Sequence, residues 1–138
     1  MAEKKLRLQI ITPQRPVLDK QVDFVALPAY DGELGVLPGH VQYVAKLNYG
    51  VLRYVDNGKE EDFAVMGGFA EIAKDTVSVF AEDAALAQEI DEESARQKVA
   101  QAKASLSSKD PDIDMDLAEI ELKRSLLMLK VKNRGQKH

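Results

Sequence analysis

Hydrophobic and polar residues alternate in short runs along the first 86 residues. Leu6, Leu8 and Ile10, for example, are separated by the polar residues Arg7 and Gln9. Successive side chains of a strand point to opposite faces, so this period of two predicts half-buried β-strands. Turn signals separate the runs at Thr12-Pro13, Asp31-Gly32, Pro38-Gly39, Asn57-Gly58 and Lys74-Asp75. The pattern predicts an all-β sandwich or flattened barrel.

The hydrophobic period becomes helical after about residue 87. Asp91 is placed to cap the first helix, because an aspartate side chain accepts hydrogen bonds from the free N–H groups of a first turn. An apolar stripe follows at spacings of four, three and four residues: Ala95, Val99, Ala102 and Leu106. This spacing predicts an amphipathic helix.

A second helix is predicted over about residues 113–132, after a break at 107–111. Its expected apolar stripe contains Ile113, Leu117, Ile120 and Leu127. A short break between two helices favours an antiparallel hairpin. The chain is therefore predicted to be α+β with two domains, a β-sandwich domain over 1–86 and a C-terminal two-helix hairpin over 87–138.

Charge is distributed unevenly along the chain. Residues 1–86 carry 9 basic and 13 acidic side chains, residues 87–121 carry 4 and 10, and residues 122–138 carry 6 and none. The basic end suits the negative pole of a helix C-terminus. The alternative is that it docks on an acidic protein surface. The segment 126–131 is apolar almost all round, which indicates a partner beyond the hairpin itself.

The composition excludes several classes of function. There is no cysteine, which rules out disulfides, thiolate metal sites and cysteine nucleophiles. The only histidines are His40 and His138, so neither a catalytic triad nor a histidine metal site is expected. The net charge of −4 argues against nucleic-acid binding. No apolar run approaches the roughly 20 residues that span a bilayer.

Two further motifs have ordinary structural explanations. Asp110, Asp112 and Asp114 with Glu121 superficially match a calcium loop, but Met115 occupies the position that requires glycine. Acids clustered at a helix N-terminus explain this segment better. The pair Gly67-Gly68 lacks the following GK[ST] of a phosphate loop, so it predicts a bulge or a close approach between backbones.

Several segments together resemble one family. GELGVLPGH at 32–40 resembles the GELG(I/V)xPGH signature of the epsilon subunit of bacterial F-type ATP synthases. MGGFAEI at 66–72 resembles the SGGFxEV segment of that family, with Met66 in place of serine. LRLQIITPQRPVL at the start and AEIELKRSLLML near the end also match, so the resemblance covers essentially the whole chain.

The resemblance implies a non-catalytic rotor component of the central stalk. Its β-domain is expected to contact the γ subunit and the c-ring, and to help couple proton or sodium flow to rotation. The helical hairpin is expected to move between a folded and an extended state, and to block ATP hydrolysis when it reaches the α/β catalytic head. The location implied is the cytoplasmic face of the cell membrane, reached only through the complex.

The resemblance also assigns residues to these contacts. Asp31 and Glu33 match positions that face the c-ring, and His40 matches a position near γ. From their charge, we also expect the basic residues of the last helix to dock on the acidic catalytic head: Lys123, Arg124, Lys130, Lys132 and Arg134. No metal site is implied.

Some relatives bind ATP in the folded hairpin. Of that motif, Asp91 and Arg124 match, whereas Ser94 and Met128 stand where arginines are expected. Loss of two phosphate-pairing cations predicts little or no ATP binding, and therefore no cofactor. The alternative function is a free-standing adaptor with a β-sandwich and a helical arm, which co-purification with a membrane-bound ATPase would distinguish.

Overall fold

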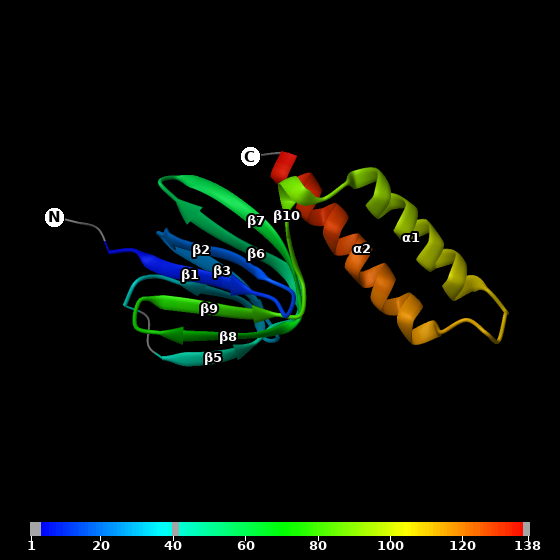
Figure 1. The fold of residues 1–138 in the computed structure, drawn as a ribbon, viewed down its shortest axis with the longest axis horizontal. Helices are drawn as coiled ribbons and strands as arrows, with labels where there is room; N and C mark the ends of the chain where they lie inside the picture. The colour runs from blue at the N-terminus through cyan, green and yellow to red at the C-terminus, as the bar shows by residue number, and fades with distance from the viewer. Residues whose placement is uncertain (1–3, 40–41, 137–138) are drawn as a thin grey trace.

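The computed structural model describes residues 4–39 and 42–136. In these segments ten strands form two five-stranded sheets, and a helical hairpin follows them (Figure 1). Sheet A contains, in spatial order, β2 (Pro16–Val22), β1 (Leu6–Ile11), β9 (Thr76–Ala81), β8 (Gly68–Ala73) and β5 (Tyr43–Lys46). Sheet B contains β10 (Ala84–Leu86), β7 (Lys59–Met66), β6 (Tyr49–Asp56), β3 (Phe24–Ala29) and β4 (Gly32–Val36).

The core lies between the two sheets and follows the predicted alternation. Leu6, Leu8 and Ile10 of β1 are fully buried, whereas Arg7 between them is exposed. They belong to one apolar cluster that also contains residues of sheet B such as Phe63. Strands β1 and β9 pair in parallel, and the other strand pairs are antiparallel. The predicted sandwich is confirmed.

Two glycine positions require a backbone that other residues rarely adopt. Asn57 and Gly58 have φ angles of 52° and 79°, as expected for the predicted two-residue hairpin turn between β6 and β7. Gly68 is the first residue of β8 in sheet A, just after the chain leaves β7 of sheet B. A Cβ on Gly68 would lie 2.0 Å from the carbonyl oxygen of Phe80. The predicted close approach between backbones is therefore correct.

The C-terminal part contains a short 3₁₀ helix, η1 (Ala87–Glu89), and two antiparallel helices, α1 (Glu92–Ser107) and α2 (Met115–Gln136). Asp91 caps α1 as predicted, and its side chain accepts hydrogen bonds from the N–H groups of Glu93 and Ser94. Asp114 accepts from the N–H of Leu117 at the start of α2. The acidic cluster thus lies at a helix N-terminus, in agreement with the preferred explanation.

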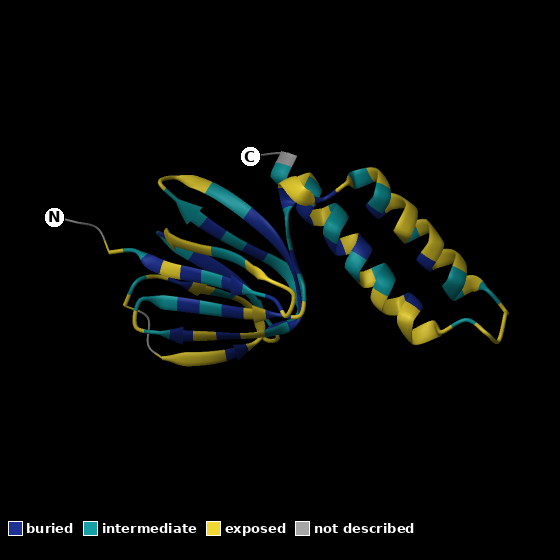
Figure 2. Ribbon diagram, viewed as in Figure 1, coloured by how far each residue is buried: buried dark blue, intermediate teal, exposed yellow. Residues whose placement is uncertain are grey.

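Helix α2 lies against the outer face of sheet B, and α1 packs on α2 (Figure 1). Figure 2 shows α1 with mostly exposed and partly buried residues, whereas the turns of α2 nearest the sandwich contain buried ones. The C-terminal part of α2 therefore covers part of sheet B from outside, α1 rests on α2, and neither helix enters the core between the sheets.

The predicted apolar stripe of α2 is only partly right. Leu127 is buried, but Leu117 and Ile120 are 54% and 48% exposed. The buried residues in this part of the helix are instead Ala118 and Ser125. Small side chains at the contact let helices approach closely, and they carry little hydropathy signal. The helix also continues four residues beyond the predicted end, to Gln136.

Candidate functional site

The contact between α2 and sheet B has an apolar centre. Leu127 and Val131 of α2 pack into a cluster that is separate from the core of the sandwich. The other buried members are Ala64, Met66, Ala87 and Ile90. Val131 is fully buried and Leu127 is 8% exposed, so the sandwich itself covers part of the apolar segment 126–131. An outside partner is not needed for these two side chains.

Arginine side chains surround the apolar centre and pair with carboxylates of the β-domain. Arg134 Nε donates to Oδ2 of Asp62 at 3.3 Å, and Arg134 Nη2 lies 3.6 Å from Oε2 of Glu60. Arg124 forms an ion pair with Asp83. The Asp62 side chain is completely buried. Ionic contacts thus hold α2 on the β-domain at two places, ten residues apart on the helix.

The remaining cations of the last helix differ in their contacts. Lys132 Nζ donates to the carbonyl oxygen of Ala87 at 3.3 Å. The ammonium of Lys123 lies 4.8 Å from the centre of the Tyr49 ring, a cation–π contact. Lys130 is exposed. Of the five residues predicted to dock on another protein, Lys123, Arg124 and Arg134 therefore contact the β-domain of their own chain in this state, and Lys132 contacts η1.

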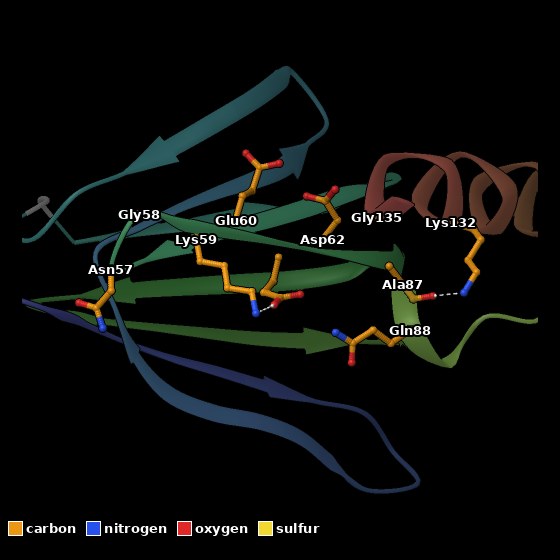
Figure 3. Close-up of a pocket in the computed structure, with 10 residues that line it drawn as sticks. Asn57, Gly58, Lys59, Glu60, Asp62, Ala87, Gln88, Lys132 and Gly135 are labelled. Atoms are coloured by element: carbon orange, nitrogen blue, oxygen red, sulfur yellow. Dashed lines mark hydrogen bonds and ion pairs between the residues drawn. The ribbon is translucent and has the colours of Figure 1, made fainter. Parts of the chain in front are cut away.

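An acidic groove of about 600 Å³ runs from the β6–β7 turn to the end of α2. Figure 3 shows Glu60 and Asp62 on β7, beside the last turn of α2 with Gly135. Lys132 closes one end through its hydrogen bond to Ala87. A Cβ on Gly135 would lie 2.7 Å from the Cβ of Ala87, so this glycine allows the last turn to approach η1 closely.

The β3–β4 turn and the start of β4 carry the two carboxylates predicted to face the c-ring. Asp31 and Glu33 are both exposed. Glu33 Oε1 accepts from Nη2 of Arg53 at 3.0 Å, and Arg53 Nη1 donates to Glu60 at 3.4 Å. The hydrogen bond to Glu33 raises the pKa of the Arg53 guanidinium above its ordinary value, against the effect of partial burial. His40 lies outside the described residues.

The outer face of sheet A carries an apolar patch that the sequence analysis missed. Phe69 of β8 and Phe80 of β9 are paired in register, and their rings stack with centroids 5.0 Å apart. Phe69 is 46% exposed and Val44 of β5 is 64% exposed. The available signal in the sequence was Phe80 itself. It is an apolar residue at a position that the alternation of β9 assigns to the outer face, between the buried residues Val79 and Ala81. Exposed aromatic pairs of this kind are typical of protein interfaces.

Asp91 and Arg124, the two residues that match an ATP motif, line one cavity of about 240 Å³. Asp91 is occupied in capping α1, and Arg124 pairs with Asp83. Lys98 is the other cation that lines the cavity. This volume is below the usual range of pockets for drug-sized ligands. The structure thus brings the two residues together without the cluster of cations that a triphosphate requires.

Two features of the described residues limit the chemistry. Within residues 4–39 and 42–136, neither α-helix carries an apolar stretch long enough to cross a bilayer. In the same part of the chain, no three histidine or carboxylate side chains gather closely enough to hold a metal ion.

Comparison with known proteins places these features in a family. The family model described as "ATP synthase, Delta/Epsilon chain, beta-sandwich domain" matches residues 5–87. The companion model for the long alpha-helix domain matches residues 88–133. The chain belongs to the ATP synthase delta/epsilon family. The resemblance identified from the sequence is confirmed.

Relatives in the delta/epsilon family match over most of their length. The ATP synthase epsilon chain of Nitratidesulfovibrio vulgaris is 40% identical over 130 residues, which are 94% of this chain and 97% of the relative. That of Elusimicrobium minutum is 50% identical over 108 residues, 78% of this chain and 80% of the relative.

A similar fold occurs in a solved assembly. A chain in the cryo-EM structure of the Euglena gracilis mitochondrial ATP synthase, which contains OSCP, F1 and the c-ring, aligns with a TM-score of 0.77 at 25% identity. The alignment covers 97% of this chain and 82% of that chain. Both parts of the delta/epsilon fold, the sandwich and the helices, therefore fall within the compared region.

Proposed function

We propose that this chain is the epsilon-type subunit of the central stalk in an F-type ATP synthase. In that position it couples ion-driven rotation of the c-ring to ATP synthesis, with protons or sodium ions as the coupling ion. The single observation that supports this best is the match of both family models across residues 5–133. The chain acts within the complex as a non-catalytic subunit, and no catalytic group is assigned to it.

The β-domain supplies the fixed contacts of the rotor. Asp31 in the β3–β4 turn and Glu33 at the start of β4 are exposed carboxylates suited to basic or polar loops of the c-ring. The γ subunit packs near His40 and on the apolar patch of sheet A around Phe69 and Phe80. Burial of exposed aromatic side chains stabilises a protein interface, because it removes apolar surface from water.

The helical hairpin supplies regulation by leaving the sheet and extending toward the catalytic head. The docked contact is small, with an apolar centre of two α2 side chains and a few ion pairs. A competing surface that binds the extended form needs only to exceed this contact. Undocking frees Arg124, Lys132 and Arg134 for acidic surfaces of the α/β head, where the extended helices inhibit ATP hydrolysis.

A crosslink across the docked contact tests the regulatory role. Cysteines replacing Ala64 and Val131, two members of the same buried cluster, would tie α2 to β7 in a chain that has no other cysteine. ATP hydrolysis by the assembled enzyme is expected to be uninhibited when the pair is oxidised, and inhibited again after reduction. Equal hydrolysis in both states would contradict the inhibitory role.

The proposed location is the cytoplasmic face of the cell membrane, where the chain is held through the γ subunit and the c-ring. Co-purification tests this assignment. The tagged chain should bring down the other stalk and catalytic subunits from detergent-solubilised membranes. Recovery of the chain alone under conditions that keep the enzyme intact would favour a free-standing adaptor.

A further inference from the structure

A row of alternating acidic and basic side chains crosses the outer face of sheet B. It begins at Glu33 on β4 and ends in the last turns of α2. The successive contacts are Glu33 to Arg53 at 3.0 Å, Arg53 to Glu60 at 3.4 Å, Glu60 to Arg134 at 3.6 Å and Arg134 to Asp62 at 3.3 Å. The row thus links the β3–β4 turn to the docked helix.

The strand register places these side chains on one face. Arg53 of β6 is directly opposite Asp62 of β7, and Glu60 is two residues before Asp62, so its side chain points to the same side. Figure 3 shows Glu60 and Asp62 beside the end of α2. The Arg53 guanidinium also lies 5.4 Å from the centre of the Phe24 ring on β3, which helps to hold it in place.

Arg53 divides its donors between two carboxylates. Its Nη2 and Nε groups donate to Glu33, and its Nη1 group donates to Glu60. Glu60 is shared in turn between Arg53 and Arg134. A guanidinium that loses one carboxylate turns its donors to the other, because unsatisfied charged donors are costly when partly buried. Any change at Glu33 therefore alters the competition for Glu60.

We propose that the row Glu33–Arg53–Glu60–Arg134 is a relay that couples binding at Glu33 to undocking of α2. A cationic group of a partner that binds Glu33 displaces Arg53. Arg53 then pairs fully with Glu60 and competes with Arg134 for that carboxylate. Arg134 is left with a weaker hold on β7, and the docked state of the hairpin loses stability.

The assignment of a c-ring loop as the partner at Glu33 rests on the proposed function. Glu33 is a residue proposed to face the c-ring, so the partner chemistry is a lysine or arginine side chain of a ring loop. Contact at the foot of the stalk would then favour release of the hairpin. The side chains of Arg53 and Glu60 are 27% and 23% exposed, whereas that of Glu33 is 55% exposed. Solvent ions therefore screen the charges of Arg53 and Glu60 less than the charge of Glu33.

A single cysteine measures undocking in the full isolated chain. The chain contains no cysteine, so Val131→Cys creates one thiol, which is buried in the docked state. The rate of labelling by a soluble thiol reagent reports how often α2 leaves the sheet. Glu33→Gln imitates neutralisation by a cationic partner. It is expected to raise the labelling rate about two- to fivefold, the range of a partly exposed ion pair.

The double substitution decides whether Arg53 carries the effect. In the Arg53→Gln background, Glu33→Gln is expected to leave the labelling rate unchanged. Asp31→Asn is the matched control, because this neighbouring carboxylate makes no ion pair within the described residues, and it should leave the rate at the parent value. Molar salt should reduce the effect of Glu33→Gln.

Hydrogen exchange of the α2 amides in the cysteine-free chain provides a second measurement, independent of the cysteine probe.

The relay is overturned if Glu33→Gln leaves labelling and exchange unchanged, or if it accelerates them equally with and without Arg53. Because both measurements use the isolated chain, such a result leaves the place of the chain in the stalk standing. Conversely, failure of the chain to assemble with a c-ring would leave a measured coupling between Glu33 and Arg53 intact.

Discussion

Arg134 Nε lies 3.3 Å from Oδ2 of Asp62, and the Asp62 side chain is completely buried where α2 meets sheet B. This contact joins the last turn of α2 to a strand more than seventy residues earlier in the sequence. A buried carboxylate that loses a charged donor is destabilising, because desolvation of the charge is then less fully compensated. The contact is therefore the ionic centre of the docked hairpin.

Arg134→Gln is expected to destabilise the docked state by about 1–3 kcal/mol, the usual cost of removing a donor from a buried carboxylate. Hydrogen exchange of the α2 amides measures this change. Lys130→Gln is the matched control on the same helix, because Lys130 is exposed, and it should change exchange little. Equal exchange in the two variants would show that the Arg134 contact does not hold the helix.

The apolar centre gives a second, independent prediction. Leu127→Ala should destabilise the chain by about 2–3 kcal/mol, because it removes a buried side chain and leaves a cavity between α2 and β7. Leu126→Ala, the adjacent residue at 46% exposure, should cost less than about 1 kcal/mol. Urea unfolding followed by circular dichroism at a helical wavelength compares them. Similar losses of unfolding free energy in both variants would show that Leu127 does not face the sheet in preference to Leu126.

Two glycines with positive φ angles should respond differently to alanine. Gly68→Ala is expected to prevent normal folding, because the added Cβ would collide with the backbone of Phe80. Gly58→Ala has open space around it and only the cost of a left-handed backbone, about 1 kcal/mol. Soluble yield and the thermal midpoint distinguish these outcomes. A well-folded Gly68→Ala variant would mean that β8 and β9 separate there easily.

Asp23 should make stability depend on acid pH. Its pKa is lowered by hydrogen bonds from the Lys5 ammonium and from the N–H of Asn57 in the β6–β7 turn. A carboxylate whose pKa is lower in the folded state stabilises that state above the unfolded pKa of about 3.9, and the contribution is lost as pH falls through the folded value.

Asp23→Asn is therefore expected to be less stable than the parent at pH 7, and the difference should shrink below about pH 4. Urea midpoints at pH 7 and pH 3 give the comparison. Lys5→Met removes the first of the two donors and should reduce the same pH-dependent difference. A constant gap between Asp23→Asn and the parent at both pH values would exclude this role of the ionised carboxylate.

Nucleotide binding should be absent or very weak. The cavity beside Asp91 has Arg124 already paired with Asp83. Ser94 and Met128 also line this cavity, and they stand where the family resemblance predicts arginines. We expect no measurable heat on titration of the full chain with ATP at micromolar concentrations, because two phosphate-binding cations are missing. Micromolar affinity by calorimetry would contradict this prediction, whatever the position of the hairpin.

The fold was largely predictable from local patterns. Alternation fixed the face of strands such as β1, the Asn57-Gly58 pair fixed a hairpin turn, and Asp91 marked the start of α1. Each of these signals acts over a few residues, so it can be found without knowing the tertiary structure.

The candidate site was less predictable, because it depends on contacts between distant segments. The sequence indicated that the basic residues of α2 bind an acidic surface, but it gave no way to find that Asp62 and Asp83 of the same chain provide one here. The exposed pair Phe69 and Phe80 was likewise hidden, since both residues fit an apolar strand and only the sheet register brings their rings together.

The connection between the helices, residues 108–114, lies at the far end of the hairpin from the docked turns of α2 (Figure 1). Helix α1 has 16 residues and therefore extends about 24 Å from the sandwich. A partner that pulls on this distant loop acts through a long lever arm on the contact at Arg134 and Val131. A modest force on the loop at 108–114 therefore produces a large torque at the docked end of α2. This geometry suits a subunit of a rotating stalk.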